Sequence, residues 1–532
     1  MSLHIIDWII IAVYLMGMIG LSVYLSRGQS NEEDYYLGGN DTGFFPIAIS
    51  TMATQCSTNS ILGAPAFVAF TLGGGLVWLQ YEIALPLAMI VVMAFMLPFF
   101  RSLKIISVYN YLELRFGPET RMVLSVLFQF LRAFATGVTV YGISLVISYC
   151  TGVSFFWSVV GLGIITIIYD SIGGMKAVIY SDVIQMGVLF VSILLIIYMA
   201  ISLLGGPADI MNFVSADRVN AIDFSHTGLG DGQNFSFWPM LFGGFFLYAS
   251  YYGCDQTQVQ RELSTKSIDD TNKSLFVNGI LRFPLVLTYC FLGICIAAYV
   301  AKFPEFIDLL PKTDKGTPNY NMSVPIFVLK EFPVGIIGIF MVGLFSAAMS
   351  SLDSTINSLS ATTIEDIIKK FTTIDKKKEL LYSKLLTVFW GILCVVFAFY
   401  VENIAESIIE AINKIGSLIN GPILGVFLLG LLTKRCNQLG ALLGFGCGFI
   451  LNAILWVKAP EISWLWWNAI GFVVTFGVGF LVSFKNTDYP SEQLVWSRGA
   501  LTKLGSKVDW KKYYLLLAAY SVLITLILLW IS

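Results

Sequence analysis

The chain has 532 residues, of which 57% are hydrophobic and only 12% are Asp, Glu, Lys or Arg. Soluble proteins carry about 25% charged residues, so this chain has too few charges to cover a globular surface. The composition therefore argues against a soluble enzyme, a nucleic-acid-binding protein and a disordered chain. The mean hydropathy of +0.78 indicates an all-α protein that crosses a membrane many times.

The first apolar run covers residues 5–24 and has no basic segment before it. It is long enough to cross a bilayer, so we expect a retained helix rather than a cleaved signal peptide. The eight cysteines lie mostly in apolar segments, which indicates packing residues rather than disulfides. Two histidines are too few for a histidine-based metal site or proton relay.

The hydrophobic pattern predicts about 14 spans, each of roughly 20 apolar residues. Their approximate centres are Leu15, Met52, Ile90, Gly137, Ile165, Phe190, Gly244, Leu287, Leu344, Gly391, Leu418, Phe445, Val474 and Val522.

The basic residues predict that both termini lie outside the cell. With the N-terminus outside, about 23 of the 32 Lys and Arg residues fall in inside loops and about six in outside loops. Only Arg132, Arg282 and Lys414 fall within predicted spans. We expect the loop charges to be solvated anchors, including those at Arg101, Lys104, Arg115, Arg121, Arg261, Lys266 and Lys273.

Three spans are interrupted or lined by polar residues, at 53–60, 250–258 and 350–358. Backbone that leaves a helix within a membrane must line a cavity or be buried in protein. The first two interruptions lie about five spans apart. Polar breaks at corresponding places in two halves indicate a transporter with inverted repeats and a central binding site.

Four segments in order resemble the sodium/solute symporter family. They are the tyrosine-rich stretch 107–116, the Gly-Gly and Asp-Val-Ile-Gln pattern in 173–185, residues 258–261, and the serine-rich run from Ser350. The resemblance implies one transporter domain over 1–532. Its five-plus-five inverted core covers about 43–432, with one extra helix before it (about 5–25) and three after it (about 437–532).

The resemblance also implies a principal sodium site between the first and eighth core helices. Its ligands are the carbonyls of Ala53, Cys56 and Ala347 and the hydroxyls of Ser350 and Ser351. Oxygen donors of this kind suit a small hard cation. The alternative is that the two serines bond back to the preceding helical turn.

A second sodium site, implied by some family members, involves Asp182 with Ser350, Asp353 and Ser354. The protein is therefore expected to bind one or two sodium ions. Asp353 departs from the serine of the sialic acid branch. Two carboxylates at one site either strengthen cation binding or share a proton, because like charges raise one pKa.

The implied substrate site centres on Arg132, which lies deep in a span where bacterial sialic acid symporters carry an arginine. Its planar guanidinium suits a carboxylate. The other implied substrate-binding residues are five with polar side chains and one aromatic residue: Ser57, Asn59, Ser60, Gln80, Glu82 and Tyr251. The alternative is a structural ion pair between Arg132 and Glu82.

Other features resemble neighbouring branches of the family. Tyr81 and Glu82 are similar to a pair that binds hexose in sugar symporters, and Arg282 falls where those carry a lysine. Tyr251 and Tyr252 match an aromatic gate. The stretch 256–268 is similar to vitamin and monocarboxylate transporters.

The predicted function is a sodium-coupled secondary active symporter that imports an organic anion, with sialic acid as the first candidate. A sugar, vitamin or monocarboxylate symporter is the alternative, and a channel or a transporter-like sensor is the alternative from another class. The expected partners are the solute, sodium and the lipid bilayer of the plasma (cytoplasmic) membrane, without nucleic acid. The expected state is a monomer without enzymatic activity.

Overall fold

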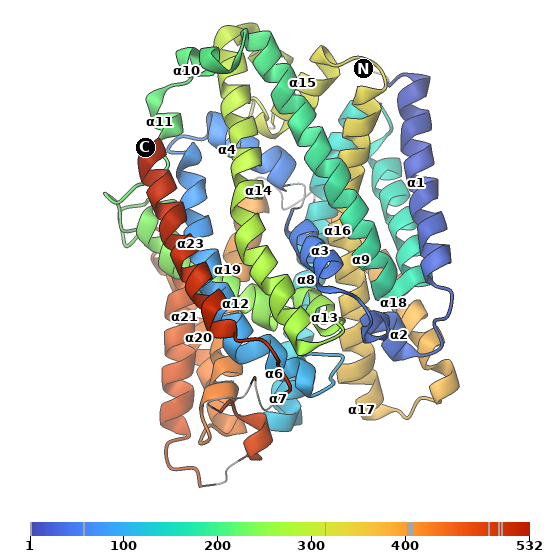
Figure 1. The fold of residues 1–532 in the computed structure, drawn as a ribbon, viewed down its shortest axis with the longest axis vertical. Coiled ribbons are helices and arrows are strands. Elements are labelled where there is room, and N and C mark those ends of the chain that lie inside the picture. The colour runs from blue at the N-terminus through green and yellow to red at the C-terminus, as the bar shows by residue number, and fades with distance from the viewer. Residues whose placement is uncertain are drawn as a thin grey trace.

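Long helices run side by side along the long axis of the molecule (Figure 1). The computed structural model describes residues 3–56, 59–313, 315–401, 408–487, 490–497, 501 and 504–532. Within these residues, β-type pairing is limited to isolated bridges such as that between Thr42 and Thr265. The prediction of an all-α architecture is therefore confirmed.

Among the described residues, 11 helical segments are long and apolar enough to cross a membrane. This confirms a multi-pass membrane protein. The segments are α1 (Ile5–Leu25), the run from η3 to α6 (Leu76–Ser102), α8 (Pro118–Thr151), α9 (Phe155–Leu204), α14 (Ile268–Lys302), the run from α16 to α17 (Ile336–Phe371), α18 (Lys376–Val401), Lys414–Leu432 within α19 (Ile408–Leu432), α20 (Gln438–Lys458), α21 (Trp464–Val482) and α23 (Trp510–Ile531).

Two further membrane-length segments are broken in the middle, at two of the predicted polar interruptions. The first is α3 (Phe44–Gln55), which ends where Cys56 leaves helical geometry with ψ of 64°, and the chain resumes in η2 (Asn59–Gly63) and α4 (Ala64–Phe70). The second is η6 (Pro239–Gly243) with α12 (Gly244–Cys254), where Asp255 is extended before α13 (Gln256–Leu263). The helix α16 (Ile336–Thr362) instead continues unbroken through its serine-rich stretch.

The 50-residue helix α9 bends at Gly174, which has φ of 58° and ψ of −159°. A straight helix of this length would measure about 75 Å, more than twice the roughly 30 Å hydrocarbon core. A Cβ at Gly174 would lie 2.5 Å from the carbonyl oxygen of Tyr35, and left-handed φ favours glycine. The glycine therefore allows both the bend and the close approach of α2 (Glu32–Leu37).

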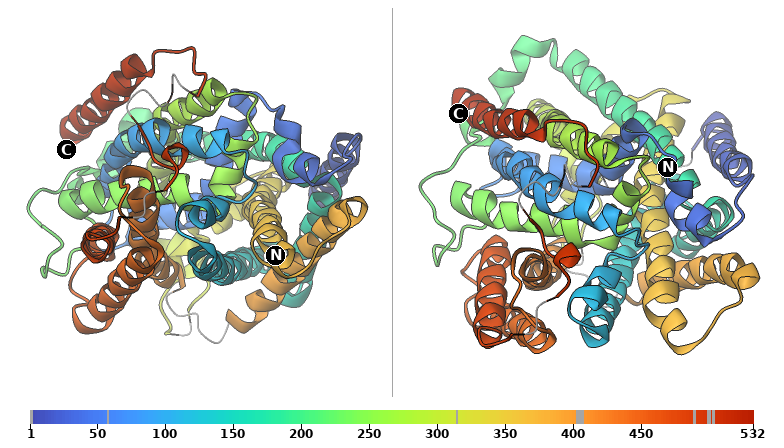
Figure 2. Two further views of the ribbon diagram at one scale, coloured as in Figure 1. Left: turned by 90° about the horizontal axis from the view of Figure 1, so that it is seen from below. Right: turned by 60° about the horizontal axis from the view of Figure 1, so that its bottom comes forward.

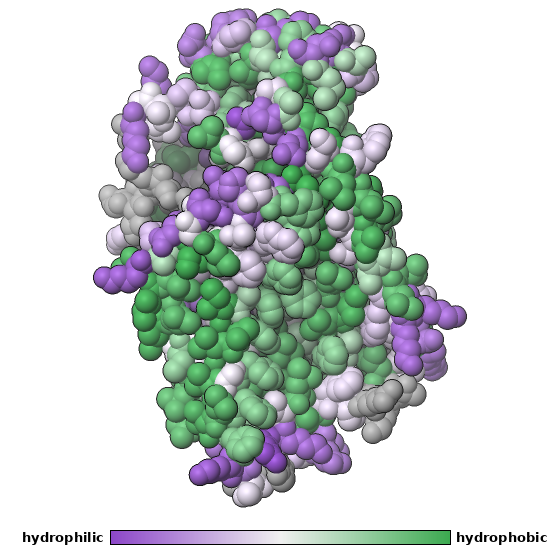
Figure 3. Space-filling model, turned by 90° about the vertical axis from the view of Figure 1, so that its left-hand side faces the viewer, coloured by the Kyte–Doolittle hydropathy of each residue, from purple (hydrophilic) through white to green (hydrophobic). Residues whose placement is uncertain are grey.

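The helices at the centre of the bundle pack closely against one another, and the helices at its edges form an apolar outer surface. The helix α16 packs against α8 and α9, and α3 packs against α9 and α14. Figures 1 and 2 show α1 at one edge of the bundle and α20, α21 and α23 at the opposite edge. Hydrophobic side chains cover much of the lower half of the face in Figure 3, whereas hydrophilic groups gather at the top, across the upper middle and at the bottom. This distribution suits a protein surrounded by lipid.

The prediction that loop charges are solvated is wrong for three arginines, because distant segments supply partners. Arg115 in α7 (Tyr109–Arg115) donates to the carbonyls of Gly430, Thr433 and Cys436 near the end of α19. Arg121 pairs with an acid of α7 and with one in η9 (Thr363–Ile368). Arg261 is fully buried among residues of the predicted second sodium site.

Candidate functional site

The first broken helix and α16 meet at the predicted principal sodium site. Ala53, Cys56, Ala347 and Ser350 line one small pocket, together with Gln185, Met186, Leu189 and Ser346. The hydroxyls of Ser350 and Ser351 each lie 3.4 Å from the carbonyl oxygen of Ala347, to which they donate. The structure thus brings four of the five predicted sodium-site residues to one pocket, and it also shows the back-bonding that was the alternative role for the serines.

Arg261 lies among the residues of the predicted second sodium site. Its Nη2 is 3.2 Å from Oδ2 of Asp182 and also donates to the hydroxyl of Ser354. Its Nε donates to Ser50 at 2.7 Å, and Ser50 donates to Asp182 at 2.6 Å. Asp182, Arg261 and Ser354 have no exposed surface. A sodium ion at Asp182 would therefore have to share that carboxylate with a guanidinium or displace it.

Asp353 and Asp170 lie beside the pair of Asp182 and Arg261. With Asp182, they make three fully buried carboxylates in this cluster. Tyr169 donates to Asp353, and Asn357 donates to Asp170 at 3.2 Å. One oxygen of Asp170 and one of Asp182 have no hydrogen-bond partner among the described residues. One guanidinium and three carboxylates leave an excess of negative charge, which favours binding of a cation or a proton.

Arg132 on α8 is bound to the second broken helix and not to Glu82. Its Nη1 lies 3.6 Å from Oδ2 of Asp255, and its Nη2 donates to the hydroxyls of Thr257 at 2.9 Å and Tyr251 at 3.4 Å. The guanidinium also lies over the Tyr251 ring, 5.5 Å from the centroid. The alternative of an Arg132–Glu82 ion pair is therefore excluded in this structure.

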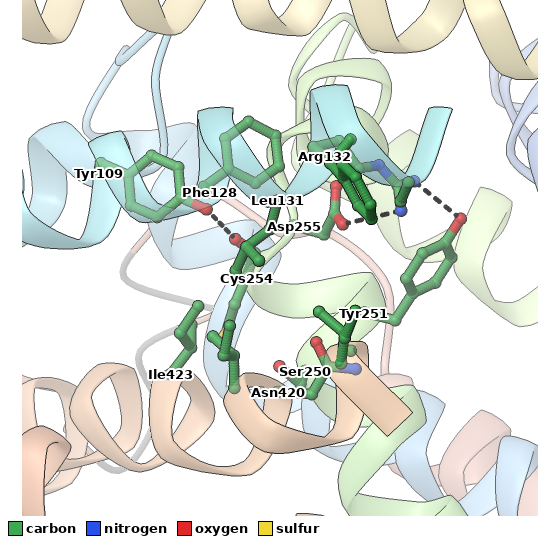
Figure 4. A pocket seen from close by; sticks show the side chains of 15 residues that line it. Tyr109, Phe128, Leu131, Arg132, Ser250, Tyr251, Cys254, Asp255, Asn420 and Ile423 are labelled. Carbon is green, nitrogen blue, oxygen red and sulfur yellow. Dashed lines mark hydrogen bonds and ion pairs between the residues drawn. The ribbon is translucent and has the colours of Figure 1, made fainter. Parts of the chain in front are cut away.

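The Arg132–Asp255 pair lies on the wall of a cavity of about 130 Å³ between α8, the α12–α13 break and α19. Figure 4 shows Arg132 and Leu131 on one side of it and Asn420 and Ile423 on the other. The walls are mostly apolar, with a few polar groups that converge on the space. Such a mixture is typical of a small-molecule site.

Glu82 pairs with Arg282 of α14 instead, with 3.7 Å between Oε2 and Nε. Tyr248 donates to the other carboxylate oxygen at 2.8 Å. All three side chains are buried. Glu82 therefore belongs to a separate ionic cluster outside the lining of the Arg132 cavity.

The remaining predicted substrate and gate residues are dispersed. Tyr251 faces the cavity, whereas Tyr252 is buried, with its hydroxyl 2.7 Å from Oδ1 of Asn278. Gln80 accepts a hydrogen bond from the backbone of Asp223 at 2.8 Å and is fully buried. Ser60 is buried in η2. Ser57 and the side chain of Asn59 lie outside the described part of the chain.

Arg261 was predicted as a solvated loop charge, and Asp255 and Thr257 were not among the predicted site residues. All three belong to the segment from Asp255 to Leu263, in which the charged and amide side chains from Gln256 to Glu262 are buried. In a chain with so few charges, such a dense polar run beside a helix break was the available signal. Its partners were not predictable, because they come from α3, α8, α9 and α16.

Comparisons with known proteins agree with this architecture. A model of the sodium:solute symporter family matches residues 35–448. The sodium/sialic acid symporter NanT of Aliivibrio fischeri is 30% identical over 491 residues, which cover 90% of this chain and 94% of NanT. The sodium-coupled monocarboxylate transporter 1 of Xenopus laevis is 30% identical over 459 residues, 85% of this chain and 71% of that protein.

A solved structure of a sodium-coupled sialic acid symporter, in a substrate-bound outward-open state, aligns with a TM-score of 0.82 at 25% identity. The alignment covers 91% of this chain and 98% of that one. The family and these relatives are transporters, which confirms the prediction of a sodium-using carrier rather than an enzyme. The chain therefore belongs to the sodium:solute symporter family.

Proposed function

We propose that this symporter imports an organic anion through a carboxylate that binds Arg132, and that sialic acid is the first candidate. The observation that carries the proposal is a partly exposed arginine on the wall of a mostly apolar cavity. An arginine within a membrane needs an anionic or polar partner, and its fork suits a carboxylate. NanT and the monocarboxylate transporter, both relatives at 30% identity, are named for carboxylate solutes.

One sodium ion is proposed to bind at the pocket of Ala53, Cys56, Ala347 and Ser350, with Ser351 as the next residue of α16. The oxygens come from α3 and α16, so a bound ion connects the first broken helix to a continuous one. Such a connection stabilises one arrangement of the two helices. By linkage, sodium then raises solute affinity, and the solute raises sodium affinity by the same factor.

The proposed topology has 14 spans with five-plus-five inverted repeats in a single transporter domain. The 11 continuous segments become 12 when α9 is divided at Gly174. The broken segments α3–α4 and α12–α13 then supply the remaining two. An even number of spans puts both termini on one side, proposed as the outside, and Figure 1 shows both in the upper half of the molecule. The proposed oligomeric state is a monomer.

A sugar symporter is the second candidate, and the Glu82–Arg282 cluster favours it. This pair lies beside Tyr81 and Tyr248, whose rings are 4.5 Å apart and offer a surface for a pyranose. In the structure, however, Glu82 is already held by Arg282 and Tyr248. A hexose would have to compete with both.

A ligand screen by thermal shift separates these candidates. The purified protein is heated with N-acetylneuraminate, lactate or glucose, in sodium or in potassium buffer. A ligand that binds only the folded state raises the melting temperature. We expect stabilisation by at least one carboxylate, in sodium only. Stabilisation by glucose alone would favour the sugar candidate and contradict the role of Arg132.

A further inference from the structure

Asp255 is the only carboxylate that the structure pairs with Arg132 among the described residues, and it was not predicted as part of the substrate site. The side chains of Arg132 and Asp255 are 23% and 17% exposed, and both line the cavity. A solute carboxylate that binds Arg132 must therefore approach an arginine that already has a negative partner. This inference rests on the proposed function.

The ion pair between Arg132 and Asp255 is long, so a solute carboxylate can take the place of Asp255. At 3.6 Å, the distance from Nη1 to Oδ2 is longer than a charge-assisted hydrogen bond of about 2.7–2.9 Å. The Nε of Arg132 is buried and has no hydrogen-bond partner among the described residues. Since Nη2 already donates to Thr257 and Tyr251, the N–H groups of Nη1 are the donors left for a solute carboxylate.

Asp255 has a second set of partners through its other oxygen. Its Oδ1 accepts hydrogen bonds from the backbone N–H of Thr257 at 2.8 Å and from the Thr257 hydroxyl at 2.5 Å. These bonds cap the N-terminus of α13, where a carboxylate is favourable. Asp255 therefore keeps a stable environment when its other oxygen loses Arg132.

We propose that Asp255 is an internal competitor for the solute carboxylate and that binding displaces it from Arg132. Two carboxylates near one guanidinium repel each other, so Asp255 lowers the affinity for an anion and thereby promotes its release. The displacement also breaks an ionic contact between α8 and the α12–α13 break. Asp255 is thus a specificity-determining and positioning residue that links solute binding to the second broken helix.

The test compares binding of N-acetylneuraminate with binding of its uncharged methyl ester, in sodium buffer, by calorimetry on the purified protein. Asp255→Asn removes the charge and keeps a residue that caps helices well. We expect it to tighten binding of the acid by about tenfold or more, as expected for removal of a charge a few Å away, and to leave the ester unchanged. Asp217→Asn, which neutralises an exposed acid on α11 (Ala216–Val219), should change neither.

Asp255→Ser, which also retains a capping side chain, replaces the first variant if that does not fold. Weaker or unchanged binding of the acid by a folded variant, together with lost binding by Arg132→Ala, would overturn the inference and leave the proposed function standing. Normal binding of the acid by Arg132→Ala would instead overturn the proposed function, and the inference with it.

Discussion

The guanidinium of Arg132 and the carboxylate of Asp255 form an ion pair on the cavity wall, with 3.6 Å between Nη1 and Oδ2. Arg132 belongs to the continuous helix α8, and Asp255 is the extended residue that interrupts α12 and α13. The pair therefore joins a continuous helix to the break between two shorter ones. Any anion that binds Arg132 acts on this junction.

Removal of Arg132 is expected to remove carboxylate binding while sodium binding survives. Arg132→Ala should cost about 2–5 kcal/mol of solute affinity, and Arg132→Lys should restore only part, because lysine cannot form the bidentate fork. Calorimetry with N-acetylneuraminate measures both. A purely structural arginine would behave differently: affinity would persist, the melting temperature would fall, and Asp255→Asn would restore it.

Loss of one hydroxyl ligand is expected to weaken sodium binding. Ser350→Ala should raise the sodium concentration for half-maximal uptake several-fold, since a lost partner of this kind costs about 1–3 kcal/mol. The matched control is Ser358→Ala on the same helix, whose hydroxyl bonds only to carbonyls of the preceding turn. An equal effect of both substitutions would mean that the loss reflects α16 itself and not the sodium site.

The sodium dependence of uptake is expected to be hyperbolic, with a Hill coefficient near one. Arg261 already supplies a positive charge to Asp182 and a donor to Ser354, two members of the predicted second site, so we expect the remaining negative charge of the cluster to be met by a proton and not by sodium. Uptake measured over a range of sodium concentrations gives the coefficient. A value near two would show that a second ion enters. Asp182→Asn should then reduce it to one.

The ionic network around Glu113 predicts a pH-dependent contribution to stability. Burial acts to raise the pKa of Glu113, but hydrogen bonds from Lys370 and Arg121 outweigh it and hold the pKa below its usual value of 4.5. The charged carboxylate of Glu113 therefore stabilises the fold at any pH above its usual pKa. This stabilisation is lost as the pH falls through the lowered pKa.

Glu113→Gln should thus lower the free energy of unfolding at pH 7, by about 1 kcal/mol or less because the side chain is partly exposed. The difference from the parent protein should shrink as the pH falls below 4.5. Melting curves at several pH values measure it. A difference that does not change with pH would mean that packing, and not charge, is responsible.

The sequence predicted the helices and the two breaks because these depend on local composition. The polar run after Thr54 breaks α3, and the run around Asp255 separates α12 from α13. The Gly-Gly motif proved to mark the bend at Gly174, although its reason, the approach of Tyr35, is a tertiary contact.

The partners within the site were less predictable, because each contact joins distant parts of the chain. Arg261 looked like a loop charge, since nothing near it in the sequence indicates that Asp182 and Ser354 surround it. The charge of Glu82 makes it a plausible partner for Arg132 from the sequence, whereas the packing pairs Glu82 with Arg282 and Arg132 with Asp255.

Uptake into proteoliposomes tests the central claim, sodium-coupled import of a carboxylate solute, most directly. Purified protein is reconstituted, and accumulation of labelled N-acetylneuraminate is followed with an inward sodium gradient or with potassium in its place, for the parent protein and for Arg132→Ala. We predict accumulation above the external concentration in sodium only, and only with Arg132 present. Equal accumulation in potassium, or undiminished uptake by Arg132→Ala, would contradict the account.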